Sequence, residues 1–258
     1  MARSTFYYNQ GAKPDKWSVE RQRLVEIYHK NKGRYGYRRL TLAMRKDGYA
    51  VSEKTVRKLM KEVGIRCEVR MKKYKSYKGE VGHIAPNLLE RDFVAEAPHK
   101  KLVTDVTEFH LFGVKIYLSP VLDLYNSELI YYTIYRHPVL DMVTDMIEGT
   151  VAVIGRRTGA ILHSDQGWQY QHKNYQKLLK NNHLVQSMSR KGNCLDNAVM
   201  ENFFGLLKSE LLYLQKFESI DHFLAELQDY LKYYNQDRIK EKLNGMSPVQ
   251  YRTHHNKI

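Results

Sequence analysis

Residues 160–165 read AILHSD, and this short stretch decides the predicted class of fold. It is an apolar run bounded by Gly159 and by Gln166-Gly167, so it predicts a buried strand. Helical periodicity lies on both sides of it, over residues 141–153 and again over residues 174–182. Because strands that alternate with helices are typical of an α/β domain, the stretch predicts that class of fold.

The segments around this strand extend the same prediction. Upstream, three runs rich in β-branched and aromatic residues are separated by Phe112-Gly113 and Asn126-Ser127, which is typical of an antiparallel meander. The runs are KLVTDVTEFHL (101–111), VKIYLSPVLDLY (114–125) and ELIYYTIYR (128–136). The downstream pattern predicts a strand over 183–188, a long helix over 197–214, an amphipathic helix over 220–234 and a turn at Ser247-Pro248. This order predicts an α/β fold with a mixed sheet.

The N-terminal part of the chain, residues 18–64, has the periodicity of three short helices. Gly48 breaks the second helix, Ser52 is a suitable N-cap for the third, and Gly64 lies where the third helix ends. The outward face of this third helix carries four cations: Lys54, Arg57, Lys58 and Lys61. The pattern fits a helix-turn-helix that places one helix in the major groove of DNA, and it fits a plain three-helix bundle with solvated cations equally well.

Formal charge is divided unevenly along the chain. Residues 1–101 contain 25 Lys and Arg against 11 Asp and Glu, whereas residues 102–258 contain 17 of each, so the whole net charge of +14 lies in the first part. A basic segment joined to a neutral one indicates an arm that holds a polyanion such as nucleic acid, and a solvated basic surface has the same composition. Residues 66–101 show little periodicity and interleave lysines with tyrosines, which predicts a basic linker.

Other features exclude several classes of protein. No window approaches the roughly 18 apolar residues of a membrane span, and the start MARSTFYYNQ lacks the apolar core of a secretory signal. We therefore predict no membrane partner and a cytoplasmic, nucleoid-associated location. Cys67 and Cys194 form no C-x-x-C pair, which argues against a zinc module and against a disulfide framework.

Two carboxylates stand where strands rarely carry them. Asp105 interrupts the first β run and Asp165 ends AILHSD; either a bound cation compensates them or they face solvent. A third acid, Glu201, shares one helix face with Asn197 and Lys208, because these residues are four and seven positions apart along the predicted helix. Asp196 stands where that helix starts, and we interpret it as an N-cap rather than a metal ligand.

Three motifs, TDVTEF (104–109), HSDQGWQY (163–170) and SRKGNCLDNAVMENFF (189–204), resemble the acidic motifs of the DDE transposases. The resemblance is to the second-frame protein of two-frame bacterial insertion sequences, relatives of retroviral integrases. It includes the 35 residues between Asp165 and Glu201, the ending YYNQDRIKEKLNGMSPVQYR and the N-terminal helical segment. One departure is Leu102, where the family usually has Trp.

The resemblance implies an RNase H-like core in which the first and fourth strands lie side by side and bring Asp105 next to Asp165. It implies that Asp105, Asp165 and Glu201 are the catalytic acids and hold Mg²⁺ or Mn²⁺, two ions in all, for end cleavage by water and strand transfer by the freed 3′-OH. The implied organisation is a helical DNA-binding domain (1–65), the basic linker (66–101), an RNase H-like integrase catalytic core (102–215) and a C-terminal helical extension (216–258).

Further residues are candidates beside the acids. Lys208 is implied to contact the terminal DNA phosphates, and its alternative is a surface lysine favoured by the helix dipole. Arg190 and Lys191 lie on a glycine-containing loop. They are candidates for phosphate contacts, and the alternative is that they are solvated cations. His163 is two residues before Asp165, so it either touches the site or belongs to the core. Asp123 is an alternative member of the acidic set, but no second acid lies at an informative spacing from it.

Partners and competing functions complete the sequence hypothesis. The resemblance implies double-stranded DNA, both element ends and target, a homo-oligomer of at least two chains, and a first-frame protein of the same element. Since the chain starts at its own Met1, we expect it to lack the module that this first-frame protein supplies. A DNA-binding regulator or accessory subunit without catalysis, and an RNase H-like nuclease that hydrolyses without joining, are the alternatives.

Overall fold

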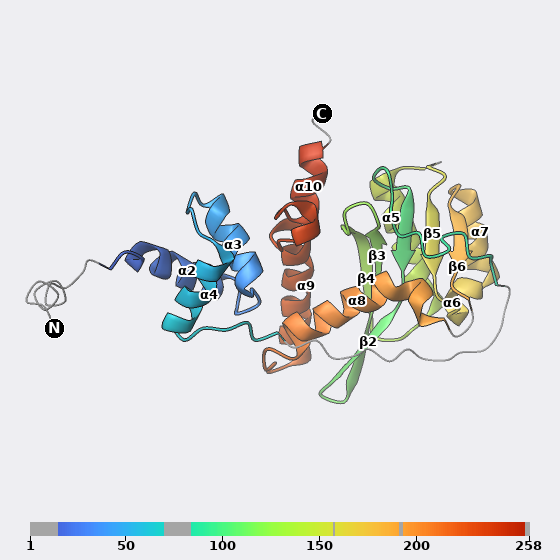
Figure 1. Ribbon diagram of the computed structural model, residues 1–258. Helices are drawn as coiled ribbons and strands as arrows, with labels where there is room; N and C mark the ends of the chain where they lie inside the picture. The colour runs from blue at the N-terminus through green and yellow to red at the C-terminus, as the bar shows by residue number, and fades with distance from the viewer. Residues whose placement is uncertain (1–14, 70–83, 157, 191–192, 256–258) are drawn as a thin grey trace, which may run out of the picture. The chain divides into compact units, whose positions relative to one another are not determined.

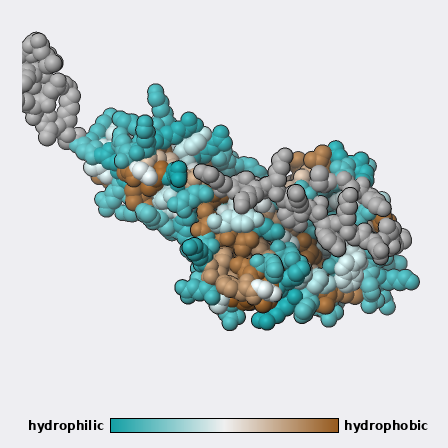
Figure 2. Space-filling model, turned by 90° about the horizontal axis from the view of Figure 1, so that it is seen from below, coloured by the Kyte–Doolittle hydropathy of each residue, from teal (hydrophilic) through white to brown (hydrophobic). Residues whose placement is uncertain are grey.

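The computed structural model describes residues 15–69, 84–156, 158–190 and 193–255, and the chain divides into two compact units at Val69/Arg70 (Figure 1). Hydrophilic residues cover most of the described surface in the view of Figure 2, with hydrophobic residues exposed in smaller areas between them. Within the described residues, no helix has both the length and the apolar character needed to cross a membrane.

The described part of the first unit, residues 15–69, forms three helices, as the sequence predicts. They are α2 (Ser18–Lys30), α3 (Tyr37–Lys46) and α4 (Glu53–Glu62). Their apolar faces meet through Leu24, Leu40, Met44, Val56 and Leu59, all fully or almost fully buried. The predicted N-cap is confirmed, because the Ser52 hydroxyl accepts the backbone N–H of Thr55 at 3.1 Å.

Parts of the predicted linker pack onto the two units. The backbone N–H of Glu68 donates to the carbonyl of Gly33, so the chain still follows the helical unit there. Farther on, the N–H of Leu88 donates to the Ser187 hydroxyl at 2.9 Å and Leu89 is buried in the core. Residues 70–83, which include most of the alternating lysines and tyrosines, lie outside the described residues.

The described residues of the second unit form one mixed six-stranded sheet, which confirms the predicted class of fold. Its strands are β1 (Lys101–Thr104), β2 (Thr107–Leu111), β3 (Val114–Asp123), β4 (Leu129–Tyr135), β5 (Ile161–Ser164) and β6 (Val185–Met188). Strands β1 and β2 pair antiparallel with successive parts of β3, and β4 pairs antiparallel with β3. β5 runs parallel to both β1 and β6.

The prediction of one continuous strand over 101–111 is wrong at one point. The run breaks at Asp105 and Val106, because the Asp105 carboxylate accepts the adjacent N–H of Val106 at 2.7 Å. A short acidic side chain competes in this way with the hydrogen bonds of the sheet. The first acid therefore lies in the break between β1 and β2 rather than inside a strand.

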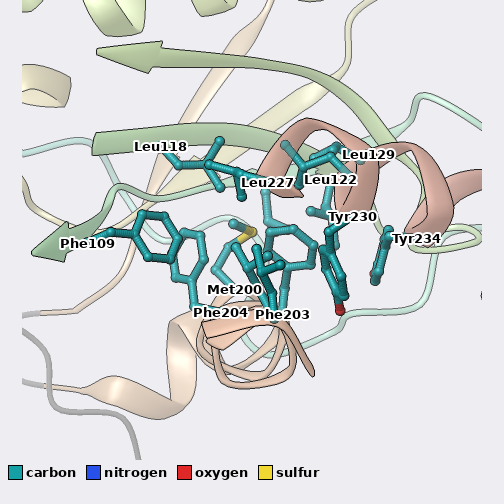
Figure 3. Packing of buried hydrophobic residues seen from close by; sticks show 14 of the residues in the cluster. Phe109, Leu118, Leu122, Leu129, Met200, Phe203, Phe204, Leu227, Tyr230 and Tyr234 are labelled. Carbon is teal, nitrogen blue, oxygen red and sulfur yellow. The ribbon is translucent and has the colours of Figure 1, made fainter. Parts of the chain in front are cut away.

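Helices cover both faces of the sheet. One face carries α5 (Leu140–Ile154), α6 (Trp168–Gln171) and α7 (Lys173–Asn181), which pack with Leu102, Val121 and Leu162. The other face carries η1 (Cys194–Asn197), α8 (Ala198–Leu207), η2 (Lys208–Leu212) and α9 (Ile220–Gln236). Figure 3 shows the second cluster, in which aromatic rings of α8 and α9 fill the space beneath β3.

Two helical predictions need correction. The long helix over 197–214 is divided into the 3₁₀ turn η1, the α-helix α8 and the π-helix η2. The helix predicted over 220–234 is confirmed as α9, which buries Leu227, Tyr230 and Tyr234 against α8 and the sheet. The predicted turn at Ser247-Pro248 starts a helix, α10 (Pro248–His255), because proline fits the first helical position and Ser247 accepts the N–H of Gln250. The short η3 (Glu241–Leu243) precedes it.

Candidate active site

Two of the predicted acids stand at the same edge of the sheet. Asp105 directly follows β1 and Asp165 directly follows β5. These strands are parallel neighbours in which Val103 pairs with His163, two residues before each acid. The carboxyl ends of parallel neighbours meet at one edge, so the topology brings together two residues that are remote in sequence.

Asp105 is the most confined of the three acids, with 9% of its surface exposed. Burial first, then the charge of Asp165 and to a smaller extent that of Glu201, raise its pKa well above the ordinary value. Hydrogen bonds from the N–H of Val106 and the amide of Asn197 offset part of this rise. Burial also raises the pKa of Asp165, whose carboxylate accepts the N–H of Gly167 at 2.8 Å.

The third acid comes from the helix over that sheet face. Glu201 lies in the first turn of α8, is partly exposed and has its pKa raised by burial. Its carboxylate makes no hydrogen bond or ion pair with the described residues. The helix is tied to the sheet edge by Asn197, whose side-chain amide donates to Oδ2 of Asp105 at 2.9 Å. The predicted face of Asn197 and Glu201 is thus turned toward the acids.

A finished metal centre is not present in the described part of the chain. No group of three or more His, Cys, Asp or Glu side chains there is gathered closely enough to hold an ion. The electrostatic coupling nevertheless joins the predicted acids, because the charges of Asp165 and Glu201 both act on Asp105. Three oxygen-donor side chains around one edge form the kind of donor set that Mg²⁺ and Mn²⁺ prefer.

The predicted role of Asp196 as an N-cap is wrong. Its carboxylate is completely buried and accepts hydrogen bonds from Asn87, Arg91 and Arg190, and no capping bond is made at the start of η1 or α8. These bonds, those of Arg190 foremost, hold the pKa of Asp196 far below its ordinary value. The helix starts instead as a 3₁₀ turn whose carbonyl at Asp196 meets the His163 ring.

Lys208 stands seven residues after Glu201, at the start of η2. Its ammonium lies 5.7 Å from the centre of the Phe109 ring. Burial lowers the pKa of Lys208, while the charges of Glu108 and Asp105 raise it. The lysine is therefore within the electrostatic field of the first acid, on the side of the sheet that carries Glu201.

The remaining cationic candidates fall in different places. Arg190 donates to Asp196 through Nε and Nη2, and Lys191 lies outside the described residues. The four cations of α4 are all exposed: Lys54, Arg57, Lys58 and Lys61. Among them the guanidinium of Arg57 stacks 3.8 Å from the centre of the Tyr37 ring, and Lys58 forms an ion pair with Glu62 at 3.7 Å.

His163 and Asp123, whose roles the sequence left open, both have structural surroundings. Fully buried His163 contacts the Ser187 hydroxyl through Nδ1 and the carbonyl of Asp196 through Nε2, and burial lowers its pKa. Asp123 is buried and accepts the N–H groups of His99 and Tyr125, so it organises a turn. Neither residue presents a free polar group to the acids.

Sequence reasoning missed Tyr170 and Arg91. Tyr170 is buried against the site; burial and the charges of Asp105 and Asp165 raise its pKa well above the ordinary value. Its signal was its place in HSDQGWQY, five residues after Asp165. Arg91, which binds Asp196, lies in the predicted linker 105 residues away in sequence, so no local pattern could reveal it.

Comparisons with family models agree with this arrangement. Residues 95–194 and 201–255 match two models described as an integrase core domain, and residues 18–73 match an HTH-like domain. Among solved structures, the simian T-cell lymphotropic virus intasome in complex with PP2A regulatory subunit B56 gamma aligns with a TM-score of 0.53 at 16% identity, over 89% of this chain and 74% of that chain. The fold and the matched models define an integrase-core enzyme of the DDE polynucleotidyl transferase class.

Sequence relatives then give the family. The chain is 50% identical over 254 residues to the putative transposase InsK for insertion sequence element IS150 of Escherichia coli (strain K12), which covers 98% of this chain and 90% of the relative. It is 49% identical over 205 residues to an uncharacterized transposase-like protein of Haemophilus influenzae, over 79% of this chain and 94% of that protein. The chain belongs to the DDE transposases of bacterial insertion sequences, enzymes that cleave DNA and transfer strands.

Proposed function

We propose that Asp105, Asp165 and Glu201 are the catalytic acids of this transposase and that they hold Mg²⁺ or Mn²⁺, two ions when the site is complete. The observation that carries the proposal is the parallel pairing of β1 with β5, which places two of the acids at one sheet edge. The bond from Asn197 to Asp105 adds the helix that bears the third acid.

The donor set fits hard divalent cations. All three side chains offer oxygen. Burial first, and then the charges of Asp165 and Glu201, raise the pKa of Asp105, and a cation between the acids would offset both the burial and the repulsion. Bound ions of this kind activate an attacking oxygen and stabilise a leaving oxygen at phosphorus. Glu201 has no bond to another described residue to break before it binds an ion.

The other residues around the edge orient the DNA and the acids. Asn197 keeps Oδ2 of Asp105 in place at 2.9 Å. Lys208 offers a cation on the same side for a backbone phosphate of the strand to be cut. Tyr170 closes the site from the opposite helical layer, where it is buried with Tyr175. In the first step water attacks the strand at the element end, and in the second the freed 3′-OH attacks the target.

The decisive experiment changes one acid at a time. Asp165→Asn and Glu201→Gln preserve size and remove charge; we expect DNA binding to persist and both cleavage and strand transfer to be lost. Asp229→Asn, which changes an exposed acid of α9, is the matched control and should keep full activity. Activity is measured on duplexes of an element end with Mg²⁺, before and after the ion is chelated.

The same assays separate the alternatives. A regulator would keep its biological effect in Asp165→Asn. An RNase H-like nuclease would hydrolyse DNA yet form no joined product when given a pre-cut end with a free 3′-OH and Mg²⁺. Joined product from the unaltered chain, lost in the acid variants, supports the transposase chemistry.

Partners follow from the reaction. Double-stranded DNA enters twice, as element end and as target, and joining two ends requires at least two chains, so we propose a homo-oligomer. We also propose that a first-frame protein of the same element contributes recognition of the ends. We also propose that the enzyme acts on DNA at the nucleoid.

A further inference from the structure

Two arginines share a single buried carboxylate beside the catalytic edge. Nε of Arg91 donates to Oδ1 of Asp196 at 3.0 Å, and Nη2 of Arg190 donates to the same oxygen at 2.9 Å. The Asp196 side chain is 0% exposed, whereas those of Arg91 and Arg190 are 44% and 57% exposed. Solvent and ligands therefore reach the guanidinium groups but not the acid that holds them.

The backbone is shaped to bring Arg91 to this place. Glu90 and Arg91 have φ values of +47° and +68°, a left-handed conformation that is costly for residues with a side chain. Asn87 supports the turn, because its Oδ1 accepts the N–H of Glu90 and its Nδ2 donates to Asp196. Buried Leu89 anchors the same turn in the core. Strain of this kind collects at functional sites, where the surrounding contacts maintain it.

The local charge favours an anion. One carboxylate cannot neutralise two guanidinium groups that meet at the same oxygen, and the other acid acting on Arg190 is the exposed, solvent-screened Glu90. Within the described residues Arg91 donates to protein only through Nε, so its two terminal nitrogens remain for a ligand. The planar fork of an arginine matches the oxygens of a phosphate.

We propose that Arg91 and Arg190 form a binding site for one backbone phosphate of DNA, with Asp196 as the positioning residue that holds both guanidinium groups. Asp196 directly precedes Asn197, whose amide bonds to Asp105, so the phosphate binds next to the acidic edge. Its place on DNA that is being cut or joined rests on the proposed function. The binding of a phosphate does not.

The test uses the full chain and DNA duplexes in which single phosphates are replaced by neutral methylphosphonates. With the unaltered protein we expect one position near the cleavage or joining point where replacement weakens binding several-fold. In Arg91→Gln and in Arg190→Gln this loss should disappear, and the slope of log affinity against log salt should fall by about 0.9, the value for one phosphate contact. Arg136→Gln, an exposed arginine just after β4, is the matched control and should retain the position-specific loss.

The outcomes separate the inference from the proposed function. If both variants bind with an unchanged slope and only melt at lower temperature, the arginines are scaffold and the inference is overturned. Should Arg91→Gln fail to fold, Arg190→Gln decides alone. Asp105→Asn, run in parallel, should lose cleavage yet keep the methylphosphonate pattern; cleavage by that variant would overturn the proposed function and leave the phosphate site standing. The duplex in which methylphosphonate replacement weakens binding, either that of the element end or that of the target, identifies which DNA supplies the phosphate.

Discussion

In the helical unit the cations Lys54, Arg57 and Lys61 of α4 are exposed. In the core unit, by contrast, the Arg238 side chain is 2% exposed and forms an ion pair with Glu210, which is 1% exposed. Nε and Nη2 of Arg238 donate to the two carboxylate oxygens of Glu210 at 2.8 and 2.6 Å, and the Tyr230 hydroxyl donates to the same group. Asp196 and Glu128 hold further arginines in the core unit.

The difference explains the uneven charge of the chain. In the core unit Arg190, Arg238 and Arg252 form ion pairs with acids, and residues 102–258 carry 17 side chains of each sign. In the helical unit the cations exceed the acids and most of those on α4 face solvent, where their charge is available to a polyanion. The same residue types therefore contribute mainly to stability in one unit and mainly to binding in the other.

The largest effect should follow from breaking the most buried pair. Arg238→Met leaves the Glu210 carboxylate uncompensated in the core, and we expect a loss of about 3–5 kcal/mol in the free energy of unfolding. The measurement is urea denaturation of the full chain, in which the fluorescence of the core unit monitors unfolding. The double variant Arg238→Met with Glu210→Leu removes both charges and should recover most of the loss. A single variant that costs less than about 1 kcal/mol would show that the pair is not the internal connection described here.

A smaller effect is expected at Asp196, because its arginines remain half exposed. Asp196→Asn keeps the shape of the side chain and loses its charge, and we expect a loss of about 1–3 kcal/mol in the free energy of unfolding at neutral pH. An N-cap would behave differently, since Asn caps a helix as well as Asp. Unfolding of the variant within a few tenths of a kcal/mol of the unaltered chain would restore the capping role.

The contribution of Asp196 to the free energy of unfolding should also depend on pH in a defined direction. The pKa of Asp196 is lowered in the folded chain, so its contribution is complete above the unfolded value of about 3.9 and declines as the pH falls below it. The difference in unfolding free energy between the unaltered chain and Asp196→Asn should therefore be constant near neutrality and shrink below about pH 4. Taking the difference removes the opposite contributions of Asp105 and Asp165, whose pKa values are raised.

This pair of arginines also shows where sequence reasoning reaches its limit. Periodicity predicts that Asn197 and Glu201 share a face, and β-propensity predicts the β run that Asp105 interrupts and the strand that Asp165 ends, because both signals are local. The partners of Asp196 are not local: Asn87 and Arg91 are 109 and 105 residues away, in a segment that lacks periodicity. A carboxylate at the start of a helix has the same sequence signature whether it caps the helix or binds two distant cations.

The division of the long predicted helix has a similar cause. Apolar spacing continues through Lys208 into residues 209–212, so the pattern predicts one uninterrupted α-helix. In the structure that segment is a π-helix, and Glu210 within it is held by Arg238 from 28 residues farther along the chain. Tertiary contacts thus decide a local conformation that propensity cannot resolve, and such π segments are frequent at functional sites.

The smallest effect on stability, and the sharpest test of the comparison, lies on α4. Lys61→Gln removes an exposed cation, and we expect a change of no more than about 0.5 kcal/mol in the free energy of unfolding. If the helix faces DNA, the slope of log affinity against log salt should nevertheless fall by about 0.9, since one phosphate contact is lost. Lys232→Gln, an exposed lysine of α9 in the core unit, is the matched control and should alter neither quantity. An unchanged slope in Lys61→Gln and in Lys54→Gln would favour the plain three-helix bundle, and the positive charge of the first unit would then have no part in binding through α4.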